Sequence, residues 1–401
     1  MERRFAANNI RGLKFFKPVR ALLERLHGEA AHPNRELHFD EYICLLLLSY
    51  FNPLVSSLRD IQAVSDHDVI AKRFGVRRAS LGSLSEASQV FDPDALRAIF
   101  QELSDQAQAR NAPKRPRGVP DDLAILGVDG TLLDALPRML WAVWLGKHQH
   151  AVKIHLQFDI LRSVPTDAAL TPGNDDEKIV LQKKLKKNCL YVLDRGYMHY
   201  ELYQSIVAAQ SSFVARVRGN AAYETIEARE LSNEARKTGV ESDQIVRLGG
   251  EKSGRRIEQP LRLVKVHVKN PPANNLKPRL RRVSRKVKSV RVCEEEFDVW
   301  LVTDQLDIPA ESVAQLYRYR WQVEIFFRWL KCTLGCRHLL AHSENGLHIQ
   351  IYAALIASLL VVLWTNRKPN KRTLLEIGLY FQGWASLNEV LKHIRTLKTA
   401  E

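Results

Sequence analysis

The sequence predicts an α/β protein, because short apolar runs typical of buried strands alternate with stretches of helical periodicity. Leu123–Val128 and Cys189–Leu193 are two such runs, and each is followed directly by an aspartate. A third observation is the stretch Tyr317–Lys331, which has no Pro or Gly and is apolar on most of its circumference, as expected of a buried helix. Polar chemistry is therefore expected at the strand ends and on that helix.

The composition favours a polyanionic partner. The chain has 401 residues, enough for a catalytic core and one or two smaller domains, with 60 basic and 45 acidic residues and a net charge of +15. Nucleic acid is the simplest partner for that surplus, and a generic basic protein is the alternative. Five cysteines without paired spacing indicate a reducing compartment, and a zinc site on Cys332, Cys336 and His338 would lack a fourth ligand.

No membrane segment or signal peptide is expected. The apolar run Ile349–Thr365 contains polar residues and is shorter than a typical span of ~20 residues, so it is interpreted as a buried helix behind the Glu324 helix. A cytoplasmic location follows as an expectation.

Residues 1–110 are expected to form an N-terminal helical DNA-binding domain. Asp40 and Asp92 are candidate caps of two of its helices, and Val69–Phe74 is expected to be a short helix beside basic residues. A helical bundle with a solvated basic face is the alternative. Residues 111–120, rich in Pro and basic residues, are expected to be a linker.

After this linker the expected order is three strands, a helix, a strand, a helix and a strand. The expected elements are the strands Leu123–Val128, Leu140–Leu145 and Val152–Ile160, the helix Asp175–Lys187, the strand Cys189–Leu193, the helix Tyr200–Ala209 and the strand Ser212–Val217. The first strand is expected to end at Asp129 and the fourth at Asp194. Chemistry in open α/β sheets lies at the carboxyl ends of strands, although a lone aspartate there is commonly a cap or turn residue.

Glu324 is the carboxylate of interest on the predicted helix. At ~100° per residue it shares one narrow stripe with four other polar side chains, which are Tyr317, Arg320, Arg328 and Lys331. Such a stripe suits a metal ion together with a phosphate backbone. The alternative is a self-satisfied network of Glu324 with arginines one turn away on either side.

The spacing Y-x2-R-x3-E-x6-K resembles the signature of the bacterial insertion-sequence transposases of family four, which carry their catalytic glutamate in that frame. All four positions match, at Tyr317, Arg320, Glu324 and Lys331. The D-G-T run at Asp129 and the D-R-G-Y run at Asp194 resemble the two aspartate motifs of the same family, and S-E-N-G at Ser343–Gly346 resembles its downstream run. The resemblance covers most of residues 120–365 and, more weakly, the N-terminal third.

The resemblance implies a ribonuclease-H-like catalytic core with a β-rich insertion before the last catalytic helix. The core would occupy residues 121–218 and 305–366, the insertion 219–304 and a C-terminal helical tail 367–401. Asp194 lies 65 residues after Asp129 and 130 residues before Glu324. The longer gap contains four β-like segments, which are Ile245–Leu248, Leu261–Val268, Ser289–Val292 and Phe297–Thr303.

The implied activity is that of a DDE transposase, which binds transposon ends and catalyses metal-dependent DNA cleavage and strand transfer in cut-and-paste transposition. Asp129, Asp194 and Glu324 would hold two Mg²⁺ ions, with Mn²⁺ as a substitute. Tyr317, Arg320 and Lys331 would bind phosphates beside the scissile bond. The implied partners are double-stranded DNA, as terminal inverted repeats and target, and a second copy of the chain in a nucleoid-associated synaptic complex.

Other basic residues are candidate DNA contacts. The run Lys277–Arg291 is interpreted as a phosphate-contacting ribbon, with a disordered basic loop as the alternative. The candidates are Arg195, Arg328, Lys153, Arg281, Arg282, Arg285 and Lys286. Trp300 and Trp321 are candidate base-stacking residues, although burial is the favoured interpretation of each. The rival functions are a domesticated transposase-derived protein that binds DNA without cleaving it and a two-carboxylate glycosidase, which the basic surplus disfavours.

Overall fold

The structure is a computed structural model that describes most of the chain. The described residues are 19, 21–30, 32–52, 54–68, 70, 76–110, 114–136, 138–144, 146–250, 255–269, 280–283, 286–289, 296–336 and 338–396. The predicted helix Val69–Phe74 lies largely outside them, as does Arg285.

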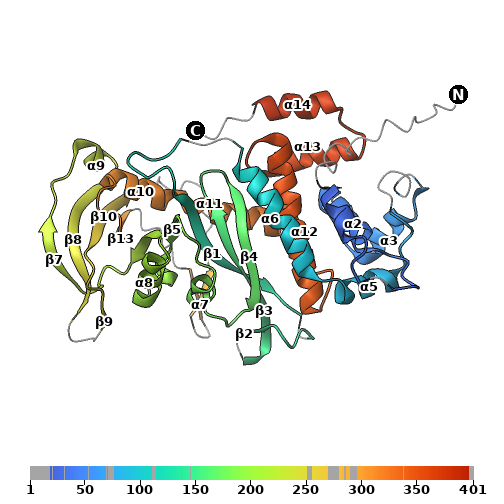
Figure 1. Cartoon of the computed structure of the whole chain (residues 1–401), viewed down its shortest axis with the longest axis horizontal. Coiled ribbons are helices and arrows are strands. Elements are labelled where there is room, and N and C mark those ends of the chain that lie inside the picture. Colours follow the sequence, from blue (N-terminus) through green and yellow to red (C-terminus); the bar gives the residue numbers. More distant parts are fainter. Residues whose placement is uncertain are drawn as a thin grey trace. The chain divides into compact units, whose positions relative to one another are not determined.

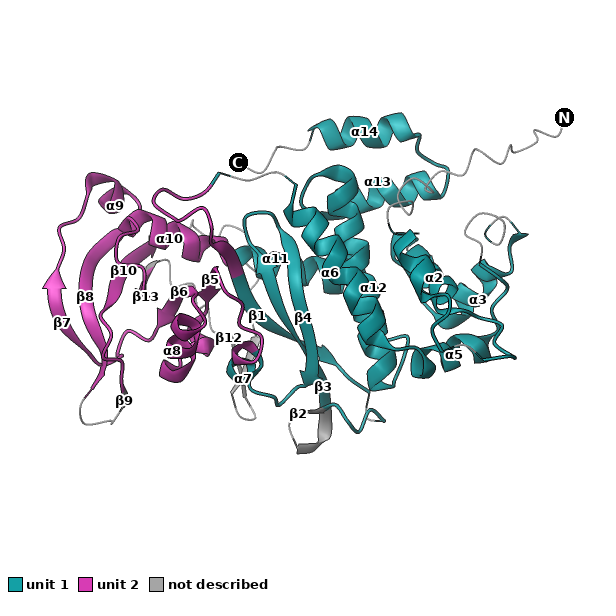
Figure 2. Ribbon diagram, in the orientation of Figure 1, with its two compact units in different colours: residues 1–114, 127–180, 321–401 teal, residues 115–126, 181–320 magenta. Residues whose placement is uncertain are grey.

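The chain forms two compact units, each built from separate stretches of sequence. Unit 1 comprises residues 1–114, 127–180 and 321–401, and unit 2 comprises residues 115–126 and 181–320 (Figure 2). Strand β1 (Ala124–Asp134) belongs to both, because its first three residues lie in unit 2 and the rest in unit 1. Both units combine helices with a sheet, which agrees with the predicted α/β class.

The strands of unit 1 are β1, β2 (Val143–Trp144), β3 (Gly146–Asp159) and β4 (Val164–Pro172). Strand β3 lies between β1 and β2 in the order, and β4 also pairs with it, antiparallel from Val152↔Pro172 to Asp159↔Val164. The sequence analysis missed β4, because prolines at Pro165 and Pro172 and the charged Asp167 between them obscure the strand pattern. Asp167 is buried and lies 3.7 Å from Arg97 Nη2, so its charge has a partner.

Strand β1 corrects the first predicted strand end. It was expected to end at Asp129, but it continues to Asp134, so Asp129 lies in the middle of the strand. The residues after Asp129 are mostly partly exposed and are not a continuous apolar run, which is why the apolar pattern ended there in the sequence. Likewise, the predicted helix Asp175–Lys187 is confined to α7 (Glu177–Gln182).

Unit 1 also holds the helices before residue 114 and after residue 321. These are η2 (Glu24–Leu26), α2 (Phe39–Phe51), α3 (Leu58–Ser65), α5 (Leu81–Val90), α6 (Pro93–Gln108), α11 (Trp321–Arg328), α12 (Glu344–Thr365), α13 (Lys371–Phe381) and α14 (Leu387–Thr396). Asp92 caps α6 as predicted, whereas α2 is capped by His38, with Asp40 inside its first turn.

Helix α12 is the central helix of unit 1. It packs against α2, α5, α6 and β4, and 94% of its most apolar stretch is buried (Figure 1). By length and composition alone the helix could cross a membrane. Its burial confirms the predicted buried helix. A helix that is apolar on all sides needs apolar neighbours, and here the other elements of unit 1 provide them.

Unit 2 is built on a longer sheet. Its strands follow the order β1, β5 (Cys189–Leu193), β6 (Ser212–Val217), β13 (Glu296–Thr303), β10 (Leu261–Lys269), β8 (Val240–Gly250) and β7 (Tyr223–Ala228), with β9 (Arg255–Arg256) beside β8. Strands β5 and β6 are parallel, whereas β6, β13, β10, β8 and β7 pair antiparallel. Helices η3 (Arg195–Tyr197), α8 (Tyr200–Ala208), α9 (Asn233–Lys237) and α10 (Ala310–Tyr319) complete the unit.

The basic run before β13 contains a separate two-stranded sheet. Strands β11 (Leu280–Val283) and β12 (Lys286–Ser289) pair antiparallel, with Arg281 opposite Lys288 and Val283 opposite Lys286. The predicted strand Ser289–Val292 overlaps β12 in one residue only, and its other residues lie outside the described ones. The backbone is therefore that of a β-ribbon at the eight paired positions.

The single helix predicted for Tyr317–Lys331 is divided. Helix α10 ends at Tyr319 in unit 2, α11 begins at Trp321 in unit 1, and Arg320 between them keeps a helical backbone with φ −51° and ψ −33°. After Arg328 the chain forms η5 (Trp329–Thr333), a π-helical turn that contains Lys331. Such turns are rare in proteins, and those that occur are frequently found at functional sites.

Candidate functional site

Asp129 lies on the face of β1 that α11 covers. Side chains alternate along a strand, so Gly127, Asp129 and Thr131 point to the same side. A Cβ atom built on Gly127 would lie 2.6 Å from Val323 Cγ2 of α11, so only glycine allows the helix to approach this closely. A tilted contact between the rings of Phe158 and Phe326, with ring centroids 4.9 Å apart, holds α11 against the same sheet.

The far end of this contact is formed by Lys331. Its Nζ donates a hydrogen bond to Thr131 Oγ1 at 2.7 Å. Asp129 therefore lies between two contacts of β1 with the same helical segment, one at Val323 and one at Lys331. The spans agree, because eight helical residues cover about 12 Å and four strand residues about 13 Å. Glu324 follows Val323 directly, and both carboxylates are half-buried.

The environment of α11 corrects one detail of the predicted buried helix. Val323, Phe326 and Phe327 are buried, but Trp321 and Ile325 are 51% and 43% exposed. Arg328, a candidate DNA contact, is also exposed. Trp321 is thus not the buried tryptophan that the sequence analysis favoured, because it lies on the side of α11 opposite to the one packed on β1.

The glycine of the D-G-T run has its own neighbour on the other face of β1. A Cβ on Gly130 would lie 2.7 Å from Glu177 Oε1, at the start of α7. Lys153, a candidate DNA contact, lies 3.3 Å from the same carboxylate oxygen and donates to the carbonyl of Asp175 at 2.9 Å. The Lys153 ammonium therefore bonds inside unit 1 and ties β3 to the start of α7.

In unit 2, Asp194 is placed at a strand end, as predicted. It follows β5 directly and caps η3, with its Oδ1 accepting from the backbone N–H of Gly196 at 2.6 Å. This bond holds the carboxylate at the end of β5 and gives the glycine of D-R-G-Y a local role. Arg195, another candidate DNA contact, is exposed beside it.

Tyr317 and Arg320 lie at the end of α10, also in unit 2. Arg320 is 9% exposed and its guanidinium carbon lies 5.7 Å from the centre of the Tyr317 ring. A cation over an aromatic face is a favourable packing that keeps the planar guanidinium oriented. Each unit thus carries part of the predicted set: Asp129, Glu324 and Lys331 in unit 1, and Asp194, Tyr317 and Arg320 in unit 2.

The S-E-N-G run has a structural role that the sequence analysis did not assign. Ser343 caps α12, and Asn345 Nδ2 donates to the carbonyl of Phe91 at 2.7 Å. A Cβ on Gly346 would lie 2.8 Å from Ser88 Cβ of α5, so glycine permits close packing of α12 on α5. The run therefore docks α12 onto the N-terminal helices.

Gln350 supports the segment that follows Lys331. It is 2% exposed, its Oε1 accepts from Leu340 N at 2.8 Å, and its Nε2 donates to His338 O at 2.7 Å. A buried amide that satisfies two backbone groups fixes the loop between η5 and α12. An isolated polar residue inside a strongly apolar run is the signal that could have identified it.

Within the described residues, Cys332, Cys336 and His338 do not form a group of side chains that could hold a metal ion. His155 is buried and its Nε2 lies 2.8 Å from Thr171 Oγ1. Cys336 is buried, whereas Cys332 is exposed. Burial raises the pKa of the Cys336 thiol to about 12, which opposes the thiolate that zinc needs.

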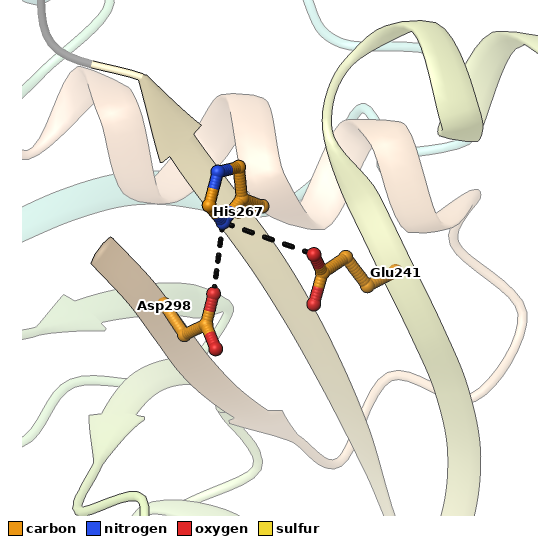
Figure 3. A group of neighbouring side chains, drawn as sticks. All are labelled: Glu241, His267 and Asp298. Carbon is orange, nitrogen blue, oxygen red and sulfur yellow. Dashed lines mark hydrogen bonds and ion pairs between the residues drawn. The ribbon is translucent and has the colours of Figure 1, made fainter. Parts of the chain in front are cut away.

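A separate cluster of charged side chains lies on three neighbouring strands of unit 2. Glu241, His267 and Asp298, shown in Figure 3, could offer three ligand atoms within 4.8 Å of one another. However, Lys265 Nζ already lies 2.6 Å from Glu241 Oε2 and 2.9 Å from Asp298 Oδ2. Because the Lys265 ammonium already contacts the two carboxylates that a metal ion would need, the cluster is assigned as an ion-pair network on β8, β10 and β13.

This network predicts a dependence of stability on pH. The hydrogen bond from His267 and then that from Lys265 lower the pKa of Asp298, and bonds to Glu241 and then Asp298 raise the pKa of Lys265. The Asp298 contribution is therefore present above the ordinary carboxyl pKa of about 3.9 and is lost as the pH falls through the lowered value. The Lys265 contribution is present below about 10.4 and is lost as the pH rises through the raised value.

Asp298→Asn is expected to reduce the acid part of this dependence. The measurement is the urea midpoint at pH 3 and pH 7, whose difference should be smaller in the variant than in the wild type. The effect should be modest and should shrink in high salt, because Asp298 is exposed and Lys265 is partly exposed to solvent. An equal difference in the two proteins would contradict the assignment of Asp298 to the network.

Comparison with known proteins identifies the family. The family model described as "Transposase DDE domain" matches residues 121–360. A putative transposase, y4zB, of Sinorhizobium fredii is 28% identical over 233 residues, which are 56% of this chain and 58% of that protein. The chain thus spans somewhat over half the length of that relative.

Two longer matches are transposases of insertion sequences. The probable transposase of IS5377 from Geobacillus stearothermophilus is 24% identical over 75% of this chain and 71% of its own. The putative transposase of IS4SA from Synechocystis is 23% identical over 82% of this chain and 84% of its own. These matches confirm the recognition of an insertion-sequence transposase and the predicted enzyme class.

A solved structure also matches along most of the chain. It is the cryo-EM structure of the piggyBac transposase synaptic complex with hairpin DNA, at a TM-score of 0.45 and 12% identity, covering 98% of this chain and 86% of that one.

Proposed function

Because the chain belongs to the transposase DDE-domain family, we propose that it binds the ends of a mobile element and catalyses metal-dependent DNA strand cleavage and strand transfer. The partners are double-stranded DNA, as terminal inverted repeats and target, and a second copy of the chain in a homodimeric complex. DNA binding without cleavage is not favoured, because Asp129, Asp194 and Glu324 are all present. The function is cut-and-paste transposition.

The observation that carries this proposal is the contact of β1 with α11 and η5. Gly127 against Val323 and Thr131 against Lys331 place Asp129 on the surface that the Glu324 helix covers. Two carboxylates on facing elements repel each other unless a cation lies between them. This arrangement, with a lysine at one end, supports a site for a metal ion and a phosphate.

Asp194 is the third acid of the proposed site. In unit 2, Ala124 N donates to Asn188 O at 2.8 Å, so β1 begins beside the residue that precedes β5. Asp129 lies five residues after Ala124, and Asp194 lies six residues after Asn188. The two aspartates therefore follow these paired residues at similar separations in the sequence. The antiparallel β3 and β4 and the parallel β5 and β6 support a ribonuclease-H-like core.

The donor set fits divalent magnesium. Carboxylate oxygens are the ligands that Mg²⁺ prefers, and it keeps open positions for water and phosphate oxygens. When bound, two such ions would supply Lewis-acid activation of the attacking oxygen and stabilisation of the leaving oxygen. The three carboxylates of the chain would offset the positive charge of the bound ions and orient those oxygens. Manganese has similar ligand preferences and is the expected substitute.

The cationic residues complete the proposed chemistry. Arg320 offers a planar fork to a phosphate beside the scissile bond, with Tyr317 behind it, and Lys331 offers a point charge at the Thr131 end of β1. Their binding to phosphate would position the backbone for in-line attack. The exposed residues Arg195 and Arg328 are proposed as further contacts along the DNA.

The proposal is tested by incubating the purified protein with a duplex that carries the terminal repeats of its own element. Strand cleavage at the repeat boundary should require Mg²⁺ or Mn²⁺ and should not occur with Ca²⁺ alone or EDTA. A scrambled repeat of equal length is the control for sequence-specific cleavage. Tight binding of the repeat without cleavage under every metal condition would support the DNA-binding alternative instead.

The β11–β12 ribbon is proposed to contact DNA phosphates. Arg281 and Lys288 lie opposite each other across it, and each neutralised phosphate contributes about 0.9 to the slope of log K against log salt. Changing both residues to Gln should therefore reduce that slope by up to about 1.8. The measurement is a series of affinities for the repeat duplex between low and moderate salt.

The matched control for the ribbon replaces Arg236 and Lys237 of α9 by Gln. These two residues are exposed and adjacent in unit 2, and their replacement changes the net charge by the same amount as the ribbon variant. The control should lower the slope less than the ribbon variant does. Equal slopes in the two variants would mean that the ribbon acts only through net charge.

A further inference from the structure

A buried guanidinium lies next to the start of α10 in unit 2. Arg262 of β10 is 4% exposed, and Asp243 of β8 is 5% exposed. Arg262 Nε donates to Asp243 Oδ1 at 2.7 Å, and Nη2 donates to Oδ2 at 2.6 Å. Apolar residues can often replace such a buried pair without loss of stability, so the pair alone does not account for an arginine here.

The remaining nitrogen of Arg262 bonds to a loop. Its Nη1 donates to the carbonyl of Leu306 at 3.1 Å and also to the carbonyl of Ile308. Arg229 Nη1 donates to the same Leu306 oxygen at 2.5 Å. The loop, residues 304–309, joins β13 to α10, and its partly buried carbonyls need partners from side chains because it lies outside the helices and strands.

The beginning of this loop is also fixed. Phe213 N of β6 donates to Asp304 Oδ1 at 2.8 Å, and Gln305 Nε2 donates to Ser212 Oγ at 2.6 Å. Burial raises the pKa of Asp304, as expected of a carboxyl enclosed by the protein. The loop is therefore attached to β6 at one end and, through Arg262, to β8 and β10 at the other.

We propose that Arg262 is a positioning residue, which sets where α10 presents Tyr317 and Arg320 to the DNA. The inference rests on the proposed function, in which those two residues bind phosphate. Arg320 lies eleven residues after Pro309, the N-cap of α10, or about 16 Å along the helix. A helix is rigid over this length, so a tilt at its start displaces Arg320, and a misplacement of about 1 Å in an active site can cost about 100-fold in rate.

Arg262→Lys isolates this role. Lysine keeps a positive charge beside Asp243, but a single nitrogen cannot hold both carboxylate oxygens and also reach two carbonyls. Val264→Ala is the matched control, because Val264 is on the same strand and face, is fully buried, and pairs with Asp243 in the sheet register. Both variants are compared below their melting temperatures, where each is folded.

In single-turnover cleavage of a pre-bound repeat duplex, Arg262→Lys should be about 10- to 100-fold slower than the wild type. Val264→Ala should cleave within about threefold of the wild type, since it removes apolar volume from β10 but keeps the bonds of Arg262 to the loop carbonyls. The dissociation constant of the duplex should change little in either variant. Equal rates in the two variants at the same fraction folded would overturn the proposal.

Two further readouts separate positioning from simple loss of stability. Combining Arg262→Lys with Arg320→Lys should slow cleavage little beyond the slower single variant, whereas additive losses would show independent roles. Hydrogen exchange of the amides of residues 310–319 should be faster in Arg262→Lys than in Val264→Ala. The exchange measurement does not need cleavage activity. Unchanged exchange in Arg262→Lys would overturn the positioning role. If exchange is faster in Arg262→Lys but the wild type never cleaves DNA, only the proposed function is contradicted.

Discussion

Asp129→Asn, Asp194→Asn and Glu324→Gln are each expected to lower DNA strand cleavage by about 10⁴-fold or more, the order seen when one member of an interdependent catalytic group is lost. Each change keeps the size of the side chain and removes the negative charge that a divalent ion needs. Folding should be largely preserved, because all three acids are only half-buried. Binding of the repeat duplex should be equal or tighter, since a carboxylate beside phosphate is repulsive without a metal.

The measurements are single-turnover cleavage in Mg²⁺, the melting temperature, and the affinity for the duplex in Ca²⁺. Asp134→Asn is the matched control, because Asp134 lies on β1 as Asp129 does but is exposed at its end. The control should cleave like the wild type. Full cleavage by any one of the three variants would remove that residue from the proposed site.

The sequence was most informative where residue type and position alone carry the chemistry. Asp194 follows a continuous apolar run, and the structure places it directly after β5. The Glu324 frame likewise depends on spacing within a few helical turns, and α10, α11 and η5 keep most of it helical. Local patterns of this kind are encoded within the segment itself, so they need no knowledge of tertiary contacts.

What could not be predicted depends on contacts between distant segments. Nothing near Gly127 shows that Val323 will pack on it, nearly two hundred residues later in the sequence. The π-helical turn around Lys331 and the bond to Thr131 are equally invisible, because they depend on how the helix meets β1. The S-E-N-G run was recognised as a motif, but its docking on α5 required the position of Ser88.

The residues around Arg262 illustrate a third case. In the strand Leu261–Lys269, Arg262 shares its alternate positions with Val264, Val266 and Val268. A charged residue among them disagrees with the local pattern, and such disagreements are expected at functional or strained positions. The sequence gives no partner for it, since Asp243 and the carbonyls of Leu306 and Ile308 come from other parts of unit 2. Only the folded chain shows that one side chain joins them.

The second large effect is expected from Arg320→Lys. Arg320 is 9% exposed and packs on the Tyr317 ring, so its guanidinium plane is oriented before DNA arrives. Lysine retains the charge but loses the planar fork. Losing one charge-assisted hydrogen bond to a phosphate costs about 2 kcal/mol, which corresponds to a cleavage rate roughly 30-fold lower. If Arg320 only neutralised Glu324, a retained charge should leave cleavage nearly normal and the main change would be in stability.

The experiment compares the melting temperature with single-turnover cleavage of a pre-bound transposon end. Arg318→Lys is the control, because Arg318 is exposed on α10 two residues before Arg320 and undergoes the same chemical change on the same helical segment. Arg320→Lys should cleave slowly with a modest shift in melting temperature, and Arg318→Lys should differ little from the wild type in both. A large loss of stability in Arg320→Lys with normal cleavage by the folded fraction would favour the ion-pair role, because the phosphate would then not depend on the fork.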